Sequence, residues 1–376
     1  MAPDLARAIV CRPPQDGRRQ WKLEDIEVYT PAEGEVLVKI IASGVCHTDL
    51  GCGSFPDGVG FPVPPYPRVL GHEGAGYVTR VGRGVTKVKP GDSVLLSFAY
   101  CGECHNCRNG APGYCAEFTP LNFCGNPKAF GAPNSKESHG IGGSFFGQSS
   151  FSNLTRVQEA SVVRVTDLVK NEDDLKLFAP LGCGIQVRAG TITELGLARA
   201  SDKVAIIGLG GAARHRGCRT IIGIDRVEAR LDLARSLGAT HTINTSTVGE
   251  GLEKAVRDIT DGSGSTITVD ATGVVALIQQ GIEFTANQGK MILLGVAPMD
   301  AALQVALVSF MVTGKQLLGS MEGGVRPADY VPRMIQWYRH GDFPIDKLIK
   351  YYKVEEFEQA IHDMEEGTTV KPILLW

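Results

Sequence analysis

The chain has 376 residues, of which 43% are apolar and 21% charged, and its formal net charge is -3. This length allows two domains with separate cores, and the small negative charge argues against a basic nucleic-acid or anionic-membrane binder. No apolar run approaches the roughly 20 residues of a membrane span. Residues 1–7 lack the apolar core of a secretory signal, so the cytosol is the expected location.

Alternating apolar and polar residues predict β-strands through the first hundred residues. The expected strands are 8–11, 26–28, 35–42, 74–82 and 92–97. Glycine- and proline-rich segments separate them, including a long loop over 51–68. We expect an irregular all-β barrel with long functional loops.

A cysteine and a histidine lie between these strands in a pattern that is typical of a metal site. Thiolate and imidazole are ligands that Zn²⁺ binds readily, and a catalytic zinc needs three protein ligands and one open position. Cys46 and His72 are two candidates, and Cys183 is the candidate third ligand. Taken alone, a cysteine is more often a small buried residue and a histidine a satisfied core residue. The cysteine cluster that follows them favours the metal.

The most specific pattern is a group of four cysteines spaced C-x₂-C-x₂-C-x₇-C, namely Cys101, Cys104, Cys107 and Cys115. Four thiolates at this spacing can surround one tetrahedral ion, as in structural zinc sites. Iron–sulfur ligation competes, but its bacterial spacing closes with three residues and proline. Disulfide pairing is the other alternative, and a reducing cytosol argues against it. The metal would supply folding energy that this loop cannot gain by burial.

From about residue 190 the chain alternates helical stretches with short β-branched runs, the pattern of a parallel sheet. The strands expected there are 203–207, 220–224, 267–270 and 291–295. Helical texture returns at 330–338 and 355–366. A last strand over 370–376 is expected to return to the first domain.

A dinucleotide-binding pattern follows the strand at 203–207. It fits G-x-G-x-x-A with Gly208, Gly210 and Gly211, a loop whose amides receive a pyrophosphate. The next strand ends at Asp225, which can accept from ribose hydroxyls and would repel a 2′-phosphate. Arg226 could instead bind that phosphate, but the acid favours NAD over NADP.

These segments together resemble the zinc-containing medium-chain alcohol dehydrogenases across essentially the whole chain. The matching segments are 44–49, 71–76, 180–184, the four cysteines and the nucleotide-binding half. Asn122-Phe123 and residues 145–151 are further similar to the aryl- and allylic-alcohol branch, which includes benzyl and geraniol dehydrogenases.

The resemblance implies an α/β protein with two domains. An irregular GroES-like β-barrel catalytic domain would comprise residues 1–186 and 326–376, and a doubly wound Rossmann coenzyme domain residues 187–325. One feature departs from the family: Asp225 follows Gly208 by only 17 positions. A parallel crossover normally requires a dozen or more residues, so the first Rossmann helix is expected to be truncated. A gene-model or splicing artefact is the favoured explanation over a true deletion with loss of activity or a tolerated rearrangement.

Position by position, the resemblance implies that Cys46, His72 and Cys183 would bind the catalytic zinc. Glu73 would be the nearby carboxylate able to move onto the metal. Asp49 would hold His72 in its tautomer.

The remaining implied roles concern the structural metal, the proton and the coenzyme. The structural zinc would be held by Cys101, Cys104, Cys107 and Cys115. Thr48 would hydrogen-bond the substrate hydroxyl and pass its proton outward, and His47 and Lys371 would meet the pyrophosphate. Leu50 and Gly51 stand where many relatives have a histidine, so the relay would end at His47 or at water.

The implied function is an NAD- and zinc-dependent dehydrogenase of a primary aromatic or allylic alcohol, or of the matching aldehyde, in a secondary-metabolite pathway. An open zinc site lowers the pKa of a bound hydroxyl strongly, taking water from about 15.7 to about 7. Two zinc ions per chain and NAD are the expected cofactors, the substrate is a small alcohol or aldehyde, and a homodimer or homotetramer is expected. The alternatives are a catalytically silent zinc protein with a defective coenzyme site and a glutathione-dependent formaldehyde dehydrogenase.

Overall fold

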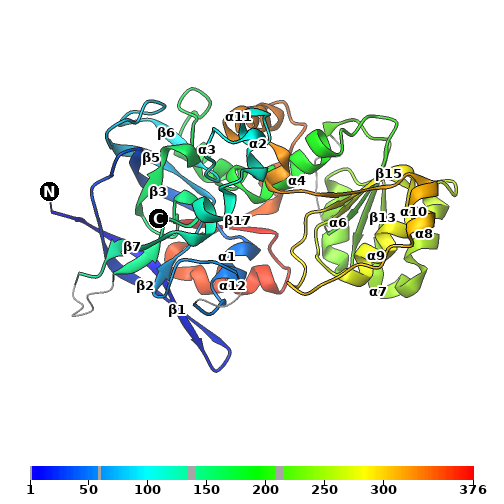
Figure 1. The fold of residues 1–376 in the computed structure, drawn as a ribbon, viewed down its shortest axis with the longest axis horizontal. Coiled ribbons are helices and arrows are strands. Elements are labelled where there is room, and N and C mark those ends of the chain that lie inside the picture. The colour runs from blue at the N-terminus through cyan, green and yellow to red at the C-terminus, as the bar shows by residue number, and fades with distance from the viewer. Residues whose placement is uncertain (1, 58–60, 134–139, 209–214) are drawn as a thin grey trace. The chain divides into compact units, whose positions relative to one another are not determined.

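The structure, a computed structural model, describes residues 2–57, 61–133, 140–208 and 215–376 (Figure 1). The chain forms two compact units. Unit 1 comprises Met1–Gln186, Val325–Gln336 and Ile345–Trp376, and unit 2 comprises Val187–Gly324 and Trp337–Pro344. Two helices, α4 (Gly184–Gly190) and α11 (Pro327–Arg339), contain residues of both units.

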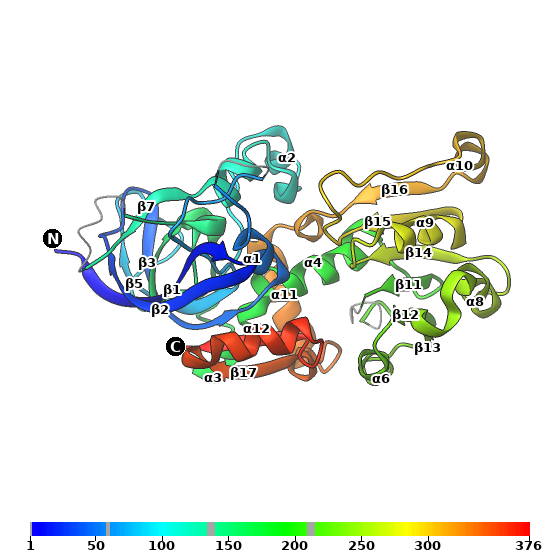
Figure 2. The same cartoon turned by 90° about the horizontal axis from the view of Figure 1, so that it is seen from below.

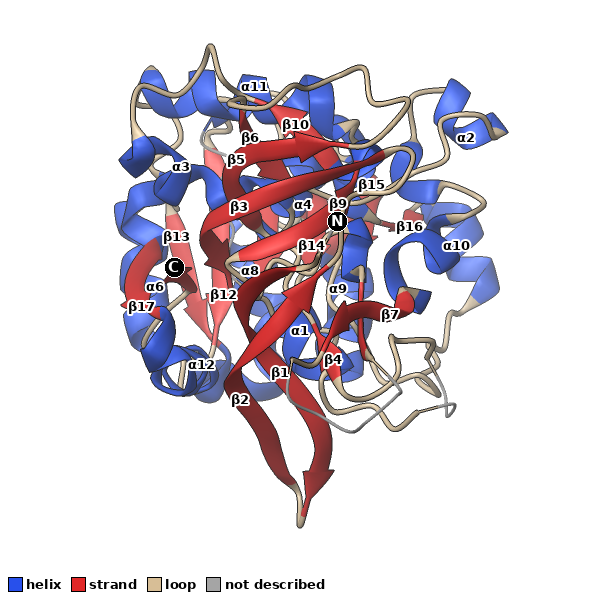
Figure 3. Ribbon diagram, turned by 90° about the vertical axis from the view of Figure 1, so that its left-hand side faces the viewer, coloured by secondary structure: helices blue, strands red, loops and turns tan. Residues whose placement is uncertain are grey.

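Unit 1 contains a closed barrel and a seven-stranded sheet. The barrel has the order β1 (Asp4–Gln15), β2 (Arg18–Val28), β7 (Asn126–Gly131), β8 (Ile141–Gly143) and β4 (Arg68–Val69). The sheet has the order β10 (Val162–Arg164), β6 (Ser93–Leu96), β5 (Gly74–Val81), β3 (Glu35–Gly44), β18 (Lys371–Leu375) and β17 (Ile349–Lys353), and β9 (Leu154–Gln158) also pairs with β3. The expected barrel is confirmed, and the β1–β2 hairpin projects from it (Figure 3).

Apolar side chains of the central strand β3 form much of the core of unit 1. Val36, Val38 and Ile40 are almost completely buried and form one cluster with Val78 of β5 and Leu96 of β6. Branched side chains of this kind favour strands because they pack well on a pleated surface. The predicted return of the last strand is confirmed, since β18 pairs with β3 in an antiparallel register.

The helices of unit 1 are short. They are α1 (His47–Cys52), α2 (His105–Arg108), α3 (Glu172–Phe178) and α12 (Phe357–Glu365). Sequence reasoning did not predict α1, although its start carries a recognisable signal. Asp49, the third helical residue, accepts a hydrogen bond from the backbone N–H of Cys46 at 3.0 Å, which is half of a capping box.

Unit 2 is built on a six-stranded parallel sheet (Figure 2). Its order is β13 (His241–Asn244), β12 (Thr220–Asp225), β11 (Lys203–Ile207), β14 (Ser265–Asp270), β15 (Thr285–Leu293) and β16 (Gln316–Gly319). In chain order this is 3-2-1-4-5-6, the doubly wound arrangement that the sequence predicts. The accompanying helices are α6 (Glu228–Ser236), α7 (Thr245–Val248), α8 (Leu252–Ile259), α9 (Val275–Phe284) and α10 (Leu307–Thr313).

The short connection between β11 and β12 does not prevent their pairing. The two strands lie parallel from Lys203↔Thr220 to Ile207↔Ile224. The predicted truncation of the helix concerns residues 209–214, which lie outside the described part of the chain. Among the helices that the structure describes, none is long and apolar enough to cross a bilayer.

Candidate metal centres

Four side chains that carry metal-binding atoms converge in unit 1. They are Cys46, His72, Glu73 and Cys183, and one ligand atom from each lies within 4.8 Å of the others. Cys46 directly precedes α1, the His72–Glu73 pair precedes β5, and Cys183 precedes α4. The structure therefore brings together residues from three separate segments that the sequence singled out. Two sulfurs, an imidazole and a carboxylate make a donor set that suits zinc.

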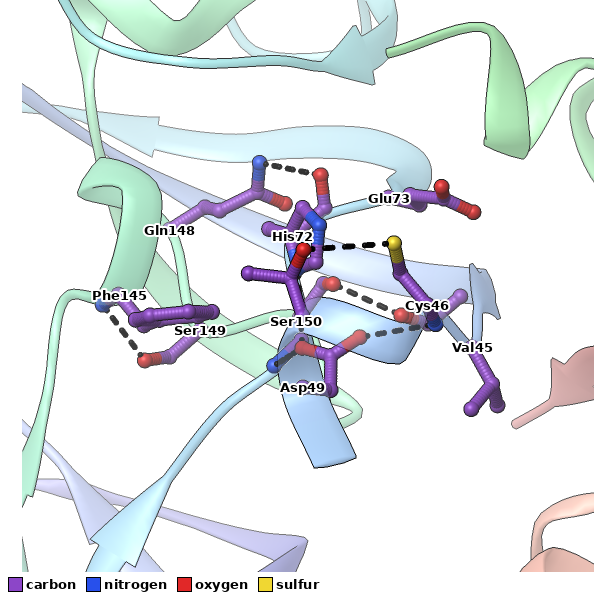
Figure 4. Close-up of polar contacts among 12 residues, drawn as sticks. Val45, Cys46, Asp49, His72, Glu73, Phe145, Gln148, Ser149 and Ser150 are labelled. Atoms are coloured by element: carbon purple, nitrogen blue, oxygen red, sulfur yellow. Dashed lines mark hydrogen bonds and ion pairs between the residues drawn. The ribbon is translucent and has the colours of Figure 1, made fainter. Parts of the chain in front are cut away.

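The imidazole of His72 is fully buried and has one nitrogen engaged (Figure 4). Its Nδ1 lies 2.9 Å from Asp49 Oδ1, the arrangement found behind metal-bound histidines. Its Nε2 has no hydrogen-bond partner within the described part of the chain. A buried polar nitrogen left without a partner is costly, and a metal ion would remove that cost. The residues present therefore fit the metal that the donor set implies.

Cys46 and His72 change each other's affinity for protons. The pKa of Cys46 lies well below its ordinary value, chiefly through its contact with Cys183, and Lys371 and His72 add to this effect. Burial lowers the pKa of His72, but Asp49 and Cys46 raise it by more, so the net shift is well upward. The metal-free site thus favours a thiolate beside an imidazolium, and the thiolate is the form that binds metals.

Glu73 is fully buried and forms an ion pair with Lys371. The ammonium lies 2.8 and 2.9 Å from the two carboxylate oxygens, and the N–H of Gly184 donates to Oε1 at 2.9 Å. Burial raises the pKa of Glu73, although Lys371 opposes it. Burial lowers the pKa of Lys371, but Glu73 outweighs it and the net shift is upward. Gly44 leaves the space that the Glu73 carboxylate occupies, because a Cβ added at Gly44 would lie 2.0 Å from Glu73 Oε2.

A second group of metal-binding atoms lies in the lobe around α2. The sulfurs of Cys101, Cys104, Cys107 and Cys115 lie within 4.8 Å of one another, and all four thiols are free. Backbone N–H groups point at the sulfurs. The strongest effect comes from the N–H of Ala116, which helps to lower the pKa of Cys104 to about 6, while burial raises the pKa of Cys107 to about 12. The predicted tetrad is thus assembled, and no disulfide joins its members.

The residues predicted to handle the substrate proton lie at the start of α1. Thr48 is half-buried, and its hydroxyl oxygen lies 3.7 Å from Cys46 Sγ. His47 is exposed, Leu50 is buried and Gly51 is exposed. The route from Thr48 to His47 or water stays a prediction.

The predicted coenzyme residues of unit 2 lie at the ends of β11 and β12. Gly208 has the left-handed φ of +83°, which favours glycine. Asp225 is almost buried, and its Oδ1 accepts from the N–H of Arg226 at 2.8 Å. The side chain of Arg226 is exposed. Gly210 and Gly211 lie outside the described residues. The pyrophosphate contact expected of Lys371 in unit 1 stays a prediction, since its ammonium is engaged by Glu73.

Aromatic rings form a continuous cluster beside His72. Phe146 stacks on the imidazole with centroids 4.5 Å apart, and Phe145 meets it edge-on at 5.5 Å. Phe123 lies 5.1 Å from Phe146 and 4.4 Å from Phe61, which is partly exposed. The cluster thus runs from the metal-binding atoms toward the surface. Sequence reasoning missed Phe61, because a lone phenylalanine in a loop carries no signal of its partners.

Comparison with known proteins places this geometry in a family. Residues 32–167 match the alcohol dehydrogenase GroES-like domain, and residues 207–339 match the zinc-binding dehydrogenase domain. Geraniol dehydrogenase from Castellaniella defragrans is 38% identical over 363 residues, which cover 94% of each chain. A probable S-(hydroxymethyl)glutathione dehydrogenase from Schizosaccharomyces pombe is 33% identical over 94% of this chain and 93% of its own.

Solved structures give the same picture. The crystal structure of benzyl alcohol dehydrogenase from Acinetobacter calcoaceticus superposes with a TM-score of 0.87 at 36% identity, over 99% of both chains. An alcohol dehydrogenase zinc-binding domain protein from Burkholderia ambifaria gives 0.90 at 35% identity, again over 99% of both. The chain is an oxidoreductase with zinc and NAD as its cofactors. It belongs to the zinc-containing medium-chain alcohol dehydrogenases, in the branch that includes the geraniol and benzyl alcohol enzymes.

Proposed function

We propose that this chain interconverts a primary aromatic or allylic alcohol and its aldehyde, with NAD as the hydride carrier. The observation that carries the proposal is the orphaned Nε2 of His72, which shares one small volume with the thiols of Cys46 and Cys183. The ring cluster beside it supports an apolar, unsaturated substrate. The geraniol and benzyl alcohol dehydrogenases among the relatives support the same substrate class. The setting in a secondary-metabolite pathway remains a prediction.

We assign two zinc sites to the chain. Cys46, His72 and Cys183 hold the catalytic ion, with Glu73 as the adjacent carboxylate, and the four cysteines at 101–115 hold the structural ion. When bound at an open site, zinc polarises the oxygen of an alcohol or aldehyde and lowers the pKa of a hydroxyl. The structural ion stabilises a lobe whose helix α2 spans only His105–Arg108.

The other residues of unit 1 prepare the site for this chemistry. Asp49 fixes the ring of His72 so that Nε2 faces the thiols. Thr48 hydrogen-bonds the substrate hydroxyl and passes its proton to His47 or water. Phe146 and its neighbours exclude water from the reacting carbon, which protects a hydride transfer from competing protons.

We assign coenzyme binding to residues 187–325 and the zinc sites to residues 1–186 and 326–376. Gly208, Gly210 and Gly211 are the residues of unit 2 to which we assign the pyrophosphate. His47 and Lys371 are the corresponding candidates in unit 1. Asp225 accepts from the ribose hydroxyls, while Arg226 is the residue that would admit NADP. The parallel pairing of β11 with β12 supports this assignment, because it leaves the sheet order of a nucleotide-binding fold intact.

A second copy of the chain is the partner that we propose for unit 2. Helix α10 contains no buried residue, and its apolar side chains Leu307, Val308, Met311 and Val312 are 71–80% exposed. The adjacent β16 is the edge strand of the sheet. Exposed apolar side chains next to an unpaired strand edge are typical of a protein–protein interface. In a homodimer the same edge of a second copy would bury them. A homotetramer would contain two such dimers.

The decisive experiment is a panel of alcohols and aldehydes with both coenzymes, on protein with a measured zinc content. Benzyl alcohol and geraniol should be oxidised with NAD at rates well above those for ethanol. Absence of saturable NADH binding, with zinc in place, would favour the catalytically silent zinc protein. Turnover of formaldehyde only with glutathione would favour the S-(hydroxymethyl)glutathione reaction. Sedimentation velocity on the same samples measures the oligomeric state.

A further inference from the structure

The side chain of Gln148 is completely buried, and it contacts the segment that carries the proposed zinc ligand His72. It follows the turn η3 (Phe145–Gly147). Its Nε2 donates to the carbonyl of His72 at 3.0 Å and to the carbonyl of Ser97 at 2.9 Å, and its Oε1 accepts from the N–H of Gly74 at 3.3 Å. Figure 4 shows the amide nitrogen directed at the His72 carbonyl. Both amide hydrogens and the amide oxygen are thus used.

Two of these bonds enclose the His72–Glu73 pair. The amide bonds the carbonyl of His72, on one side of Glu73, and the N–H of Gly74, on the other. The side-chain amide of Gln148 therefore fixes the backbone on both sides of Glu73, including the backbone of His72 itself. The ring itself is held from the opposite end by Asp49 at Nδ1.

The third bond leads toward a second proposed ligand, Cys183. Ser97, whose carbonyl accepts from Gln148, donates its own hydroxyl to the carbonyl of Gly182 at 2.6 Å. Gly182 immediately precedes Cys183, and it lies so close to the β6 strand that an added Cβ would meet Leu96 O at 1.8 Å. A continuous line of hydrogen bonds thus joins the imidazole segment to the thiol segment through one amide.

The turn that presents Gln148 is strained. Ser144, Phe146 and Ser149 adopt left-handed φ angles of 60°, 52° and 58°, which residues with a Cβ rarely adopt. Strain of this kind persists only where the surroundings fix it, and it is concentrated at functional sites. Here Ser149 clamps the turn, because its hydroxyl donates to Val69 O at 2.7 Å and accepts from the N–H of Phe145 at 3.0 Å.

We propose that Gln148 is a positioning residue of the catalytic zinc site. It holds the segments of His72 and Cys183 in register, so that their ligand atoms meet before a metal arrives. The inference rests on the proposed function, because it requires that these residues bind zinc. It predicts that loss of the amide weakens metal retention even when the fold survives.

The test compares two buried amides in the holoenzyme. Gln148→Met keeps the length of the side chain and removes all three hydrogen bonds. Asn122→Leu is the matched control, because Asn122 is equally buried and its amide makes three bonds of 2.8–2.9 Å to Ala99 and Phe118. The release of zinc to the chelator dipicolinate is followed over time and should have one kinetic phase for each of the two ions. The phase that is missing in a Cys46→Ser variant belongs to the catalytic ion.

Gln148→Met should accelerate the catalytic phase about 10–100-fold, the usual effect of losing a residue that supports a metal ligand. Asn122→Leu should lower Tm to a similar extent and leave that phase within twofold of wild type. Equal release rates in the two variants would overturn the inference. A wild-type chain that lacks the catalytic phase would overturn the proposed function itself, and the inference with it.

A second variant covers the case in which Gln148→Met does not fold. Ser97→Ala deletes the bond to Gly182 and a longer one, in which Gln186 Nε2 donates to the Ser97 hydroxyl at 3.5 Å. It should accelerate the same phase about fivefold, as expected for the loss of neutral hydrogen bonding at one hydroxyl. Where Gln148→Met does fold, the two effects should be less than additive in the double variant, because both residues act through one line of bonds. No acceleration in Ser97→Ala, or strictly additive effects, would contradict the proposal.

Discussion

Asp49 and His72 are in contact through Oδ1 and Nδ1, 2.9 Å apart, and neither side chain is exposed to solvent. The same carboxylate accepts from the N–H of Cys46 at 3.0 Å through Oδ2 and from the N–H of Gly71 at 3.0 Å through Oδ1. One carboxylate therefore sets the orientation of the imidazole and the start of the helix that follows the thiol. Two of the three proposed ligands depend on it.

Asp49→Asn should weaken zinc binding at the catalytic site about 10–100-fold, since the amide no longer favours the required tautomer. A competitive titration with a chromogenic chelator measures the affinity. Asp92→Asn is the control, because Asp92 is also buried and accepts from Lys89 and Thr166, away from the proposed ligands. It should lower Tm without changing zinc affinity. An equal loss of affinity in both variants would contradict the role of Asp49.

Zinc binding should release a proton near neutral pH. The raised pKa of His72 leaves its ring protonated in the metal-free site, whereas the lowered pKa of Cys46 leaves a thiolate that has no proton to lose. Since only the neutral imidazole binds the metal, the apparent affinity should fall as the pH falls. Calorimetry at pH 7 in two buffers with different ionisation enthalpies measures the protons released. Equal heats in the two buffers would refute this sequence of events.

Gly44→Ala should destabilise the chain by about 1–3 kcal/mol, because the added methyl would overlap Glu73 Oε2 at 2.0 Å. Gly51→Ala makes the opposite test, since an added Cβ there meets nothing within 4 Å and the site is within α1. That variant should be neutral or up to ~1 kcal/mol more stable. Thermal unfolding of both variants decides the point, and equal Tm values would show that Glu73 moves aside at no cost.

Cys104→Ser should remove one zinc ion from each chain and leave the other. The lobe around α2 should then become the first site of limited proteolysis, because its short turns bury little apolar surface. Cys124→Ser serves as the control, since Cys124 is an exposed thiol outside the tetrad. Its zinc content and its proteolytic pattern should match the unmodified chain. Two zinc ions in Cys104→Ser would mean that the tetrad is not a metal site.

The double substitution Leu307→Lys with Met311→Lys should convert the proposed dimer to a monomer. The two residues are four positions apart on α10 and therefore lie on one face of the helix, where each is more than 70% exposed. Leu5→Lys, at another exposed leucine of 74% exposure, should leave the sedimentation coefficient unchanged. A monomeric wild-type chain would remove the proposed interface.

The sequence predicts the parts of this protein whose chemistry is local. The four-cysteine spacing identifies a closed metal site because all four residues lie within one loop. The parallel sheet of unit 2 is predicted because its strands are short runs rich in apolar and β-branched residues, such as 204–207, that alternate with helical stretches. Cys46, His72 and Cys183 are candidates because of their ligand type, and the family resemblance assigns the same three residues; no spacing along the chain brings them together.

Features that depend on the tertiary fold could not be predicted in this way. The contact of Lys371 with Glu73 joins residues 298 positions apart, and no local pattern announces it. Gln148 is presented by a turn in which Ser144, Phe146 and Ser149 are left-handed, a conformation that their identities disfavour. Phe61 joins the ring cluster only because its loop folds onto Phe123. The roles of Lys371, Gln148 and Phe61 are therefore set by the residues that the fold places next to them, and not by their own side-chain type.

The pairing of Glu73 with Lys371 has a consequence for how the protein is made. A ribosome that adds roughly 5–20 residues per second needs about 15–60 s to travel the 298 positions between them. Throughout that interval the nascent barrel holds a carboxylate whose counter-ion has not been synthesised, and β3 lacks the strand that will lie beside it. The buried charges of the proposed catalytic site are therefore balanced only after all of unit 2 has been synthesised.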